Sequence, residues 1–439
     1  MIAGKGGISY ICNVENHRII RPQASGTFAE ALESVVRQLE VFLGEESGKS
    51  RLPVYVRFYL SDAQNQAAAL KDRLGSCGKG VRTCDSRTGV PLCDTDRPFA
   101  RSGENISIVE QPPLDGSRIA ALVRTSDEAE RYIFHSIRLT EAEAAGKDSY
   151  TQTRLLFGKY LDIIRPAGLE LKTHCIRTWI YVRDIDSNYA GVVKARNDVF
   201  AEEGLVDHYI ASTGIGGASG TRSAVVAMDF LTEPGISEAD KTYLKALSHL
   251  SPTRDYGVAF ERGVKVGGMS PAGSHIYISG TASIDNRGRI LHEGDVLSQT
   301  DRLLENIGAL LSEGVGKDGI SLAGIPSATG RVARLSTPKK CNFSGAPDTV
   351  PQGEPGTGIA RPQSPSAAGG AENDSGVGEG VMGVPYFVIY LRDISDYAKI
   401  DEYMQARFPG VPRIVLEARV CRPGWLIEME CEALFPETA

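Results

Sequence analysis

Apolar residues recur at helical spacing in three separate segments of the chain. Residues 294–314 ("GDVLSQTDRLLENIGALLSEG") place six of them on one stripe: Val296, Leu303, Leu304, Ile307, Leu310 and Leu311. Residues 150–169 carry a similar stripe of Leu155, Leu156, Tyr160, Ile163 and Ile164, and residues 27–45 ("TFAEALESVVRQLEVFLGE") repeat the pattern near the start. The spacing predicts three amphipathic helices, and Gly314 predicts the end of the helix in 294–314.

A strand-like run follows each predicted helix, and the three runs are related. "PVYVRFYLSDAQNQ" starts at Pro53, "RTWIYVRDIDSNY" spans residues 177–189, and "YFVIYLRDISDY" spans residues 386–397. Each run passes from apolar residues into a short polar turn that contains Asp, and a second helix is predicted after that turn. Three related helix–strand–helix units indicate an internal triplication.

This alternation of helices and strands predicts the fold class. Each helix buries its stripe on one face of a sheet, so the other face is free to pack on a neighbouring unit. We therefore expect an α+β protein in which three mixed sheets, each with helices on one face, meet at the centre. The expected units are residues 1–125, 126–240 and 250–439. The last unit contains a segment at 336–383, rich in Gly, Pro, Ser and Ala, which is expected to be a mobile insertion.

Composition and charge restrict the possible partners. The chain has 439 residues, 23% of them charged, and a formal net charge of -7, so phosphate-backbone binding is disfavoured. No apolar run approaches the roughly 20 residues that cross a bilayer, and the N-terminus has no long apolar stretch typical of a signal peptide. We expect a cytoplasmic protein that contacts neither nucleic acid nor membrane.

Cysteine usage agrees with a reducing compartment. Eight cysteines in 439 residues are too few for a disulfide scaffold, and most are expected to be free thiols. Cys77, Cys84 and Cys93 lie in a polar stretch that contains no CxxC pair and no histidine. A surface loop is therefore favoured over a zinc site, and no metal site is predicted.

The last strand carries the most distinctive charge pattern. In "EARVCRPGWLIEMECEAL" the two-residue period of a strand places Leu426 and three glutamates, Glu428, Glu430 and Glu432, on one face, with apolar residues on the other. Such an acidic face is commonly solvated, with Arg419 and Arg422 as simple ion-pair partners. In the alternative, Glu428 enters a pocket where desolvation raises its pKa, so that it can deliver a proton.

The C-terminal residues also resemble a known family. "YISGTASIDNRGRILHEGDVLSQTDRLLENIGALL", "VIYLRDISDYAKIDEYMQARFPG" and the final hairpin are similar to the reactive intermediate deaminase (YjgF-like) superfamily, whose members are usually trimers of a small α+β unit. The middle segments "RTWIYVRDIDSNY" and "YIASTGIGG" resemble its chorismatase branch. That branch folds into one polypeptide what small relatives build from three subunits. The resemblance implies an intrachain pseudo-trimer, either monomeric or a small homo-oligomer, and it is weak over the first 130 residues.

Site residues follow from this resemblance position by position. An Arg before the final hairpin and a Glu in the last strand line the superfamily pocket, and they match Arg419 and Glu428. Arginine suits a carboxylate because its planar fork makes two parallel hydrogen bonds. In the chorismatase branch the matching Glu is the proton source, and a nearby Cys, here Cys421, separates product classes. Without the resemblance, Cys421 reads as core filler, and the choice between Glu428 and Glu430 stays open.

Two further segments supply candidate binding residues. "YGVAFERGVKVGG" offers Tyr256 and Arg262; Arg262 is either a surface charge or a second carboxylate clamp. In "SGTAS", Gly280 serves either close packing or, as the resemblance implies, room for a ligand ring, with Ser279 and Thr281 in contact. "YIASTGIGG" has the Gly and hydroxyl content of an anion-cradling turn, but no Lys follows the glycines as in a P-loop.

Taken together, the residues and the resemblance predict a cofactor-independent chorismatase. Chorismate carries two carboxylates and an enol ether, so its site needs two cationic clamps and a proton donor. The pairing of Gly280 with Cys421 is similar to the 3-hydroxybenzoate-forming type; attack by water would give a dihydroxycyclohexadiene carboxylate, and both paths release pyruvate. Two alternatives stay open. One is an enamine or imine deaminase, which also needs one Arg and one Glu, and the other is a non-catalytic metabolite-binding protein.

Overall fold

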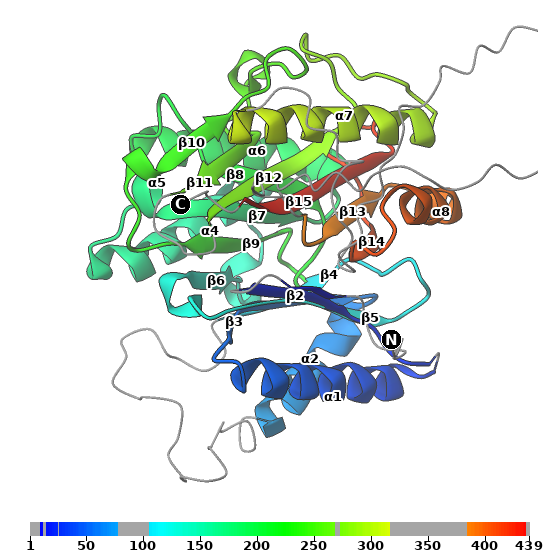
Figure 1. Ribbon diagram of the computed structural model, residues 1–439. Helices are drawn as coiled ribbons and strands as arrows, with labels where there is room; N and C mark the ends of the chain where they lie inside the picture. The colour runs from blue at the N-terminus through cyan, green and yellow to red at the C-terminus, as the bar shows by residue number, and fades with distance from the viewer. Residues whose placement is uncertain are drawn as a thin grey trace, which may run out of the picture.

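The computed structural model describes residues 9–11, 15–24, 26–77, 105–267, 273–316 and 384–435. The predicted insertion at 336–383 and the cysteines at 84 and 93 lie outside these ranges. Within them the chain forms three mixed sheets, and the helices lie on the outside (Figure 1). The α+β prediction is therefore confirmed, whereas the exact unit boundaries stay predictions.

The first sheet has five strands in the order β1-β2-β5-β3-β4. Helices α1 and α2 cover its lower face in Figure 1. A capping box of Thr27 and Glu30 begins α1, which explains why this helix starts where it does. The element bounds are β1 Ser9–Ile11, β2 Glu15–Ile20, α1 Phe28–Ser47, β3 Leu52–Leu60, α2 Ala63–Cys77, β4 Ile106–Glu110 and β5 Ile119–Ser126.

The second sheet has four strands in the order β6-β9-β7-β8. Its two long helices, α4 and α6, pack against each other and against the sheet. The element bounds are η1 Ala129–Arg131, β6 Ile133–Ile137, α3 Glu141–Ala144, α4 Ser149–Ile164, η2 Arg165–Ala167, α5 Leu171–His174, β7 Cys175–Val182, α6 Ile185–Glu202, β8 Ala211–Gly216 and β9 Val226–Thr232.

The third sheet has six strands in the order β10-β11-β12-β15-β13-β14. Helix α7 crosses above β12 and β15 in Figure 1, and α8 lies beside β13 and β14. The element bounds are η3 Glu238–Asp240, β10 Lys241–Leu244, η4 Thr253–Tyr256, β11 Gly263–Val266, β12 Ser274–Ala282, α7 Val296–Val315, β13 Phe387–Leu391, η6 Ile394–Asp396, α8 Tyr397–Arg407, β14 Arg413–Glu417 and β15 Ile427–Phe435.

All three sheets contain the same four-strand arrangement. The sets β2-β5-β3-β4, β6-β9-β7-β8 and β12-β15-β13-β14 each consist of two antiparallel pairs followed by one parallel pair. The related strands of the sequence, β3, β7 and β13, hold the same place in each set. The predicted triplication is thus present as a pseudo-threefold arrangement within one chain.

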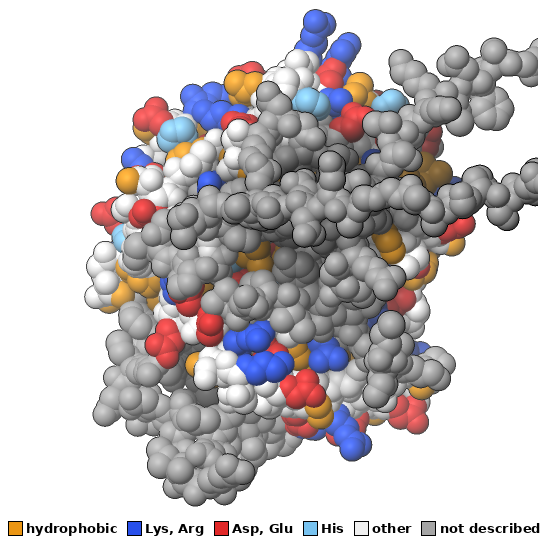
Figure 2. Space-filling view, in the orientation of Figure 1, with side chains coloured by type: hydrophobic (Ala, Val, Ile, Leu, Met, Phe, Trp, Pro, Cys, Tyr) orange, Lys and Arg blue, Asp and Glu red, His pale blue; other side chains and the backbone are white. Residues whose placement is uncertain are grey.

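Apolar and aromatic residues pack on both faces of the sheets, under the helices on the outer face and between units on the inner face. On the outer side of the second sheet, Tyr160 of α4 stacks on Phe230 of β9 with ring centroids 3.9 Å apart. On the inner side, aromatic residues of different units meet, as when Tyr55 of β3 stacks on Phe134 of β6. In Figure 2, acidic and basic side chains are interspersed over the visible described surface, and hydrophobic side chains are scattered among them.

Three details of the structure differ from the expectations drawn from sequence. Helix α7 ends at Val315 and is capped by Gly316, whose φ of 67° is left-handed. The predicted end, Gly314, lies in the last turn, where a Cβ would meet Ile276. Ile163 is exposed and outside the buried stripe of α4. The acidic face of β15 is not solvated, because Glu428, Glu430 and Glu432 are all buried.

The described residues contain neither a candidate membrane span nor a candidate metal site. In the ranges that the structure covers, no helix is both long enough and apolar enough to span a membrane. Over the same ranges, no group of three His, Cys, Asp or Glu side chains is arranged to hold a metal ion.

Candidate active site

A cavity lies where the second sheet meets the third. Its empty space, counted together with the open solvent at its mouth, is about 510 Å³. From the second unit, its lining residues are Tyr189, Arg196, Ser212 and Gly214. From the third unit, they are Tyr256, Val258, Phe260, Arg262, Gly280, Ala282, Cys421, Arg422, Trp425 and Glu428. Both repeats are therefore needed to complete the site.

Glu428 is the acidic residue of this cavity. It lies in β15 opposite Ala282 of β12 and Tyr390 of β13, and its side chain is 4% exposed. No hydrogen bond or ion pair joins its carboxyl group to any other described residue. Burial, followed by the negative charge of Glu430, raises the pKa of Glu428 to about 8. The carboxyl group therefore keeps its proton at neutral pH and can act as a general acid.

Gly280 provides the space for this carboxyl group. A Cβ at position 280 would lie 1.9 Å from Oε1 of Glu428 and 3.0 Å from Cγ2 of Thr213. The pairing of β12 with β15 shifts register between Ile278 and Thr281, so the strand bulges at this point. A glycine at position 280 thus allows Glu428 to lie directly over the backbone of β12.

Two buried arginines line the cavity together with one aromatic ring. Arg196 of α6 is 1% exposed, and its Nε and Nη2 have no hydrogen-bond partner in the described part of the chain. Arg262 donates to the hydroxyl of Tyr256 at 2.6 Å, while its Nε lacks a described partner. The two guanidinium carbons lie 5.7 Å and 5.2 Å from the ring centroid of Phe260. Because an unpaired buried cation is costly, this arrangement favours an anionic ligand.

Arg422 supplies a third cation at the cavity. Its guanidinium lies 4.8 Å from the ring centroid of Tyr256 and 4.9 Å from that of Trp425, and Nη1 donates to the carbonyl of Gly288 at 3.1 Å. Cation–π contacts of this kind fix the plane of the guanidinium while leaving other N–H groups free to donate. With three guanidinium groups and one protonated carboxyl, the lining is cationic.

Cys421 lies beside Glu428 and Tyr189. Burial, followed by the charge of Glu428, raises the pKa of the Cys421 thiol to about 12, although a hydrogen bond with Tyr189 opposes this effect. The thiol therefore stays protonated at neutral pH, and it is a small, weakly polar part of the wall and not an activated nucleophile. Burial also raises the pKa of Tyr189 well above its ordinary value.

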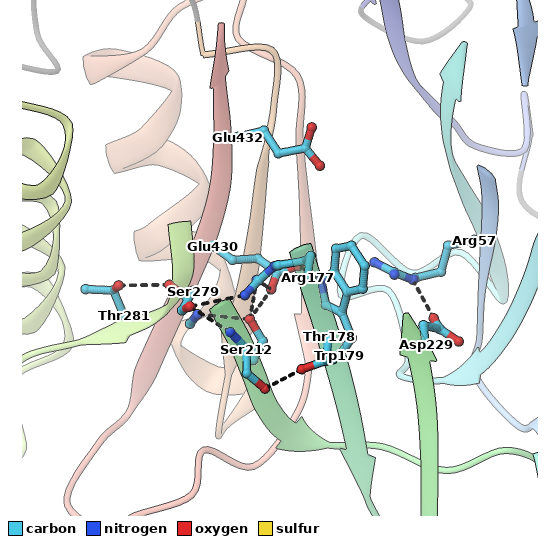
Figure 3. A network of polar contacts seen from close by, with 12 residues as sticks. Arg57, Arg177, Thr178, Trp179, Ser212, Asp229, Ser279, Thr281, Glu430 and Glu432 are labelled. Atoms are coloured by element: carbon cyan, nitrogen blue, oxygen red, sulfur yellow. Dashed lines mark hydrogen bonds and ion pairs between the residues drawn. The ribbon is translucent and has the colours of Figure 1, made fainter. Parts of the chain in front are cut away.

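The other two glutamates of β15 do not line the cavity. Glu430 accepts hydrogen bonds from Arg177, Trp179 and Thr213 of the second unit. Glu432 accepts a hydrogen bond from Tyr386 at 2.8 Å and lies apart from that group in Figure 3. The structure thus favours Glu428 over Glu430 as the candidate acid, a choice that the alternation of the strand left open.

The first and second units meet at an equivalent junction that is filled differently. The register of the repeated strands pairs Val182 with Val226 and Leu391 with Ile427, so Ala227 corresponds to Glu428. Ile137 pairs with Met228, so Arg138 corresponds to Ala282. Arg138 reaches across this junction to the hydroxyl of Ser107 at 3.0 Å and the carbonyl of Ile108 at 3.3 Å. Arg138 thus places a long side chain across this junction at the position equivalent to Ala282, whose small side chain lines the cavity.

The junction between the third and first units repeats this substitution. Leu60 pairs with Ile119 and Ile20 with Ala121, so Ala120 corresponds to Glu428 and Arg21 to Ala282. Arg21 donates to the carbonyl of Arg413 in β14 at 2.6 Å and forms an ion pair with Asp115 at 2.6 Å. At two of the three junctions, therefore, an Arg stands in the position of Ala282 and an Ala stands in the position of Glu428.

The residues predicted from sequence divide into two groups. Tyr256, Arg262, Gly280, Cys421 and Glu428 line the cavity, and their roles in binding and catalysis stay predictions. The structure does not bring Arg419, Ser279 or Thr281 to it.

Arg419, predicted as a pocket residue, does not line this cavity. Its side chain is 64% exposed and pairs with Asp186 at 3.1 Å on the surface. Arg419 was matched to the superfamily's Arg before the final hairpin, and here it lies in the loop at 418–426 between β14 and β15. Arg422, three residues later, lines the cavity instead.

Ser279 and Thr281 also face away from the cavity. The Ser279 hydroxyl donates to the carbonyl of Glu261 at 2.6 Å, and Thr281 donates to the carbonyl of Ser279 at 2.9 Å. Nor is the segment "YIASTGIGG" an anion-cradling turn, because residues 211–216 form strand β8. Within it, the backbone N–H of Ser212 donates to the Ser279 hydroxyl at 2.9 Å, so β8 joins the two units.

Arg196 is the main residue that sequence reasoning missed. It lies on the buried stripe of α6 together with Val192, Ala195 and Val199. An arginine on an apolar helical stripe is unusual, because such charges are rarely buried without a partner. Its place on the apolar stripe could have indicated a buried binding residue, although the sequence alone does not show which unit α6 would face.

Comparisons with known proteins place the fold. The chain is similar to a crystal structure of a chorismatase, with 19% sequence identity over 74% of this chain and 86% of that chain and a TM-score of 0.50. It also aligns with a member of the YjgF/YER057c/UK114 family from Mycobacterium tuberculosis (17% identity, 44% and 98% of the two chains, TM-score 0.24). RidA from an Antarctic Psychrobacter gives 19% identity, the same coverage and a TM-score of 0.24. No protein-family model and no curated protein matches the chain. The chain therefore has the fold of the chorismatase structure.

Proposed function

We propose that this chain is a chorismatase-like enzyme, which releases pyruvate from chorismate by proton transfer from Glu428. One observation carries the proposal: a buried carboxyl group that keeps its proton at neutral pH shares a cavity with three guanidinium groups. The fold shared with a chorismatase supports it.

The lining of the cavity suits a small cyclic diacid. Chorismate has two carboxylates, and Arg196 and Arg262 each keep a buried Nε without a described partner, so each guanidinium can donate a hydrogen bond to an anionic oxygen. Arg422 adds a third positive charge near the same aromatic walls. A substrate with a single carboxylate, such as a simple enamine or imine, would leave more of these cations unpaired. The three arginines therefore favour the diacid.

The proposed reaction begins with protonation of the enol ether. The O–H bond of Glu428 breaks, a C–H bond forms at the enolpyruvyl methylene carbon, and the ether carbon becomes an oxocarbenium ion. Glu430, held as an acceptor by Arg177 and Trp179, stays in place during this step. General acid catalysis of this kind contributes roughly a hundredfold to ten-thousandfold to the rate.

The second step decides the product. If water attacks the cationic carbon, its extra proton returns to Glu428, and the hemiketal splits into pyruvate and a dihydroxycyclohexadiene carboxylate. If the neighbouring ring hydroxyl attacks that carbon, it returns its proton to Glu428 and a cyclic ketal forms. Loss of the proton on the ring carbon that bears the ether oxygen, with cleavage of the ring C–O bond of the former hydroxyl, makes the ring aromatic, and the remaining hemiketal splits into 3-hydroxybenzoate and pyruvate. We propose the second product because Gly280 and Cys421 both line the cavity and their pairing resembles the 3-hydroxybenzoate-forming type.

Product analysis tests this proposal. Purified protein is incubated with chorismate, pyruvate is followed by a coupled dehydrogenase assay, and ring products are separated by chromatography against standards. We expect pyruvate and 3-hydroxybenzoate in equal amounts. Pyruvate no higher than in a protein-free control would contradict the proposal. Turnover of an amino-acid-derived imine would then indicate a deaminase, and tight binding without turnover would indicate a binding protein.

A further inference from the structure

Glu430 is fully engaged by donors from the second unit. Arg177 Nη2 donates to Oε2 at 2.8 Å, the Trp179 indole N–H donates to Oε1 at 2.9 Å, and the Thr213 hydroxyl donates to Oε2. Figure 3 shows Arg177 and Trp179 reaching toward Glu430 across the junction of the sheets. Every contact is a donor, which is the environment of a carboxylate anion.

The same group also fixes the backbone beneath Glu428. The N–H of Gly280 donates to Oγ1 of Thr213 at 2.9 Å, and that hydroxyl donates to Glu430. Arg177 reaches further to the Ser279 hydroxyl at 3.2 Å. Because the Glu428 carboxyl group lies directly over Gly280, Glu430 is connected to it through the chain of Thr213 and Gly280 as well as by proximity on one face of β15.

We propose that Glu430 is a positioning residue, which holds a fixed negative charge beside Glu428 and so keeps the Glu428 carboxyl in its acid form inside the cavity. This inference rests on the proposed function, in which Glu428 must carry a proton before the reaction. It goes beyond that function by assigning a purpose to a carboxylate that does not touch the cavity.

The charges around Glu428 set the sign of the effect. Burial raises its pKa most, Glu430 raises it further, and Arg262 and Arg177 oppose them. Other titratable or charged groups on the packed elements are Tyr189 and Arg196 of α6, Tyr256 of η4, and Cys421 and Arg422 of the loop before β15. Removal of the Glu430 charge would also leave Arg177 without its carboxylate, and both changes favour ionised Glu428.

A purely structural role for Glu430 gives a different expectation. Its three donors all come from the second unit, so it also joins that unit to β15. If Glu430 only joined the second unit to β15, its substitution would lower the melting temperature and would lower turnover, and neither loss would depend on pH. The protonation midpoint of Glu428 separates the two roles, because it moves only if the Glu430 charge acts on Glu428.

Infrared difference spectroscopy measures this midpoint without substrate. The carboxylic-acid C=O band that Glu428→Gln removes is followed from pH 5 to pH 10, with 8 as the approximate wild-type midpoint. In Glu430→Gln we expect the midpoint to fall by roughly one unit or more. Glu430→Asp keeps the charge and should restore most of the wild-type value. An unchanged midpoint in folded Glu430→Gln, or an Asp variant as low as the Gln variant, would overturn the inference.

A double variant covers the case in which Glu430→Gln does not fold. Arg177→Met combined with Glu430→Gln removes the whole buried pair and leaves no unpaired charge, which proteins commonly tolerate. Its midpoint should also lie below that of the wild type, because Glu430 affects Glu428 more than Arg177 does. Failure of the proposed reaction would appear as absent pyruvate with the infrared shift intact, so the two failures are distinguishable.

Discussion

The Glu428 carboxyl group occupies the position that a side chain at Gly280 would need, since a Cβ there would lie 1.9 Å from Oε1. Gly280→Ala should therefore displace the acid while leaving the fold intact. A displacement of about 1 Å costs roughly a hundredfold in rate, so turnover should fall by about that factor. Gly235→Ala is the control, because a Cβ at Gly235 would have no neighbour within 4 Å. Equal rates for both variants and the wild type would contradict this geometry.

The raised pKa of Glu428 makes the stability of the protein depend on pH. The unfolded chain releases this proton near pH 4.5 and the folded chain near pH 8. Between these values the unfolded state binds fewer protons, so rising pH lowers the free energy of unfolding. Glutamine does not titrate, so the gain in melting temperature of Glu428→Gln over the wild type should grow from pH 4.5 to pH 8. Exposed Glu417→Gln is the control and should show no such trend.

Arg196 is expected to lower the stability of the unliganded protein and to strengthen the binding of an anionic ligand. Its Nε and Nη2 are buried without a partner among the residues described, so Arg196→Met should raise the melting temperature of the unliganded protein. The same change removes charged hydrogen bonds to a ligand carboxylate, and the dissociation constant of a dicarboxylate analogue should rise roughly ten- to a hundredfold. Lys194→Met on the exposed face of α6 is the matched control. Unchanged affinity in Arg196→Met would exclude it from the binding site.

The three equivalent junctions predict one ligand per chain. Arg138 and Arg21 occupy two of them, and Ala282 leaves the third open. Calorimetric titration with a dicarboxylate analogue should give a stoichiometry of one. Ala282→Arg should abolish this binding, whereas Ala190→Arg on an exposed turn of α6 should not. A stoichiometry of two or three would show that the other junctions also bind.

Sequence reasoning reached the repeated architecture because each unit contains the same local signals. Each unit has an apolar helical stripe, a strand ending in Tyr-Leu or Tyr-Val, and a polar turn with Asp. These signals lie within about 40 residues of one another, so the elements can be predicted without knowledge of tertiary contacts. The period of a strand also placed Glu428, Glu430 and Glu432 on one face, and the family resemblance pointed to Glu428 among them.

What sequence reasoning missed depends on contacts between units. Arg196 contributes to a site that is otherwise mostly built by the third unit, and no local pattern indicates that α6 faces Phe260. Arg419 was preferred to Arg422 because it matched the superfamily's Arg before the final hairpin, and that match does not fix where a side chain points in the loop at 418–426. The burial of Glu430 depends on donors of the second unit, and Arg177 lies some 250 residues away from it in the sequence. The burial of Glu432 depends on Tyr386 and on Arg124 of the first unit.

The central claim is that Glu428 delivers the proton that releases pyruvate. The most direct test is the rate of pyruvate release from chorismate by the wild type and by Glu428→Gln, with analogue binding measured on both. We predict that the variant binds the analogue normally and releases pyruvate about a hundredfold more slowly or worse. Wild-type release by a variant that is fully occupied by substrate would contradict the claim.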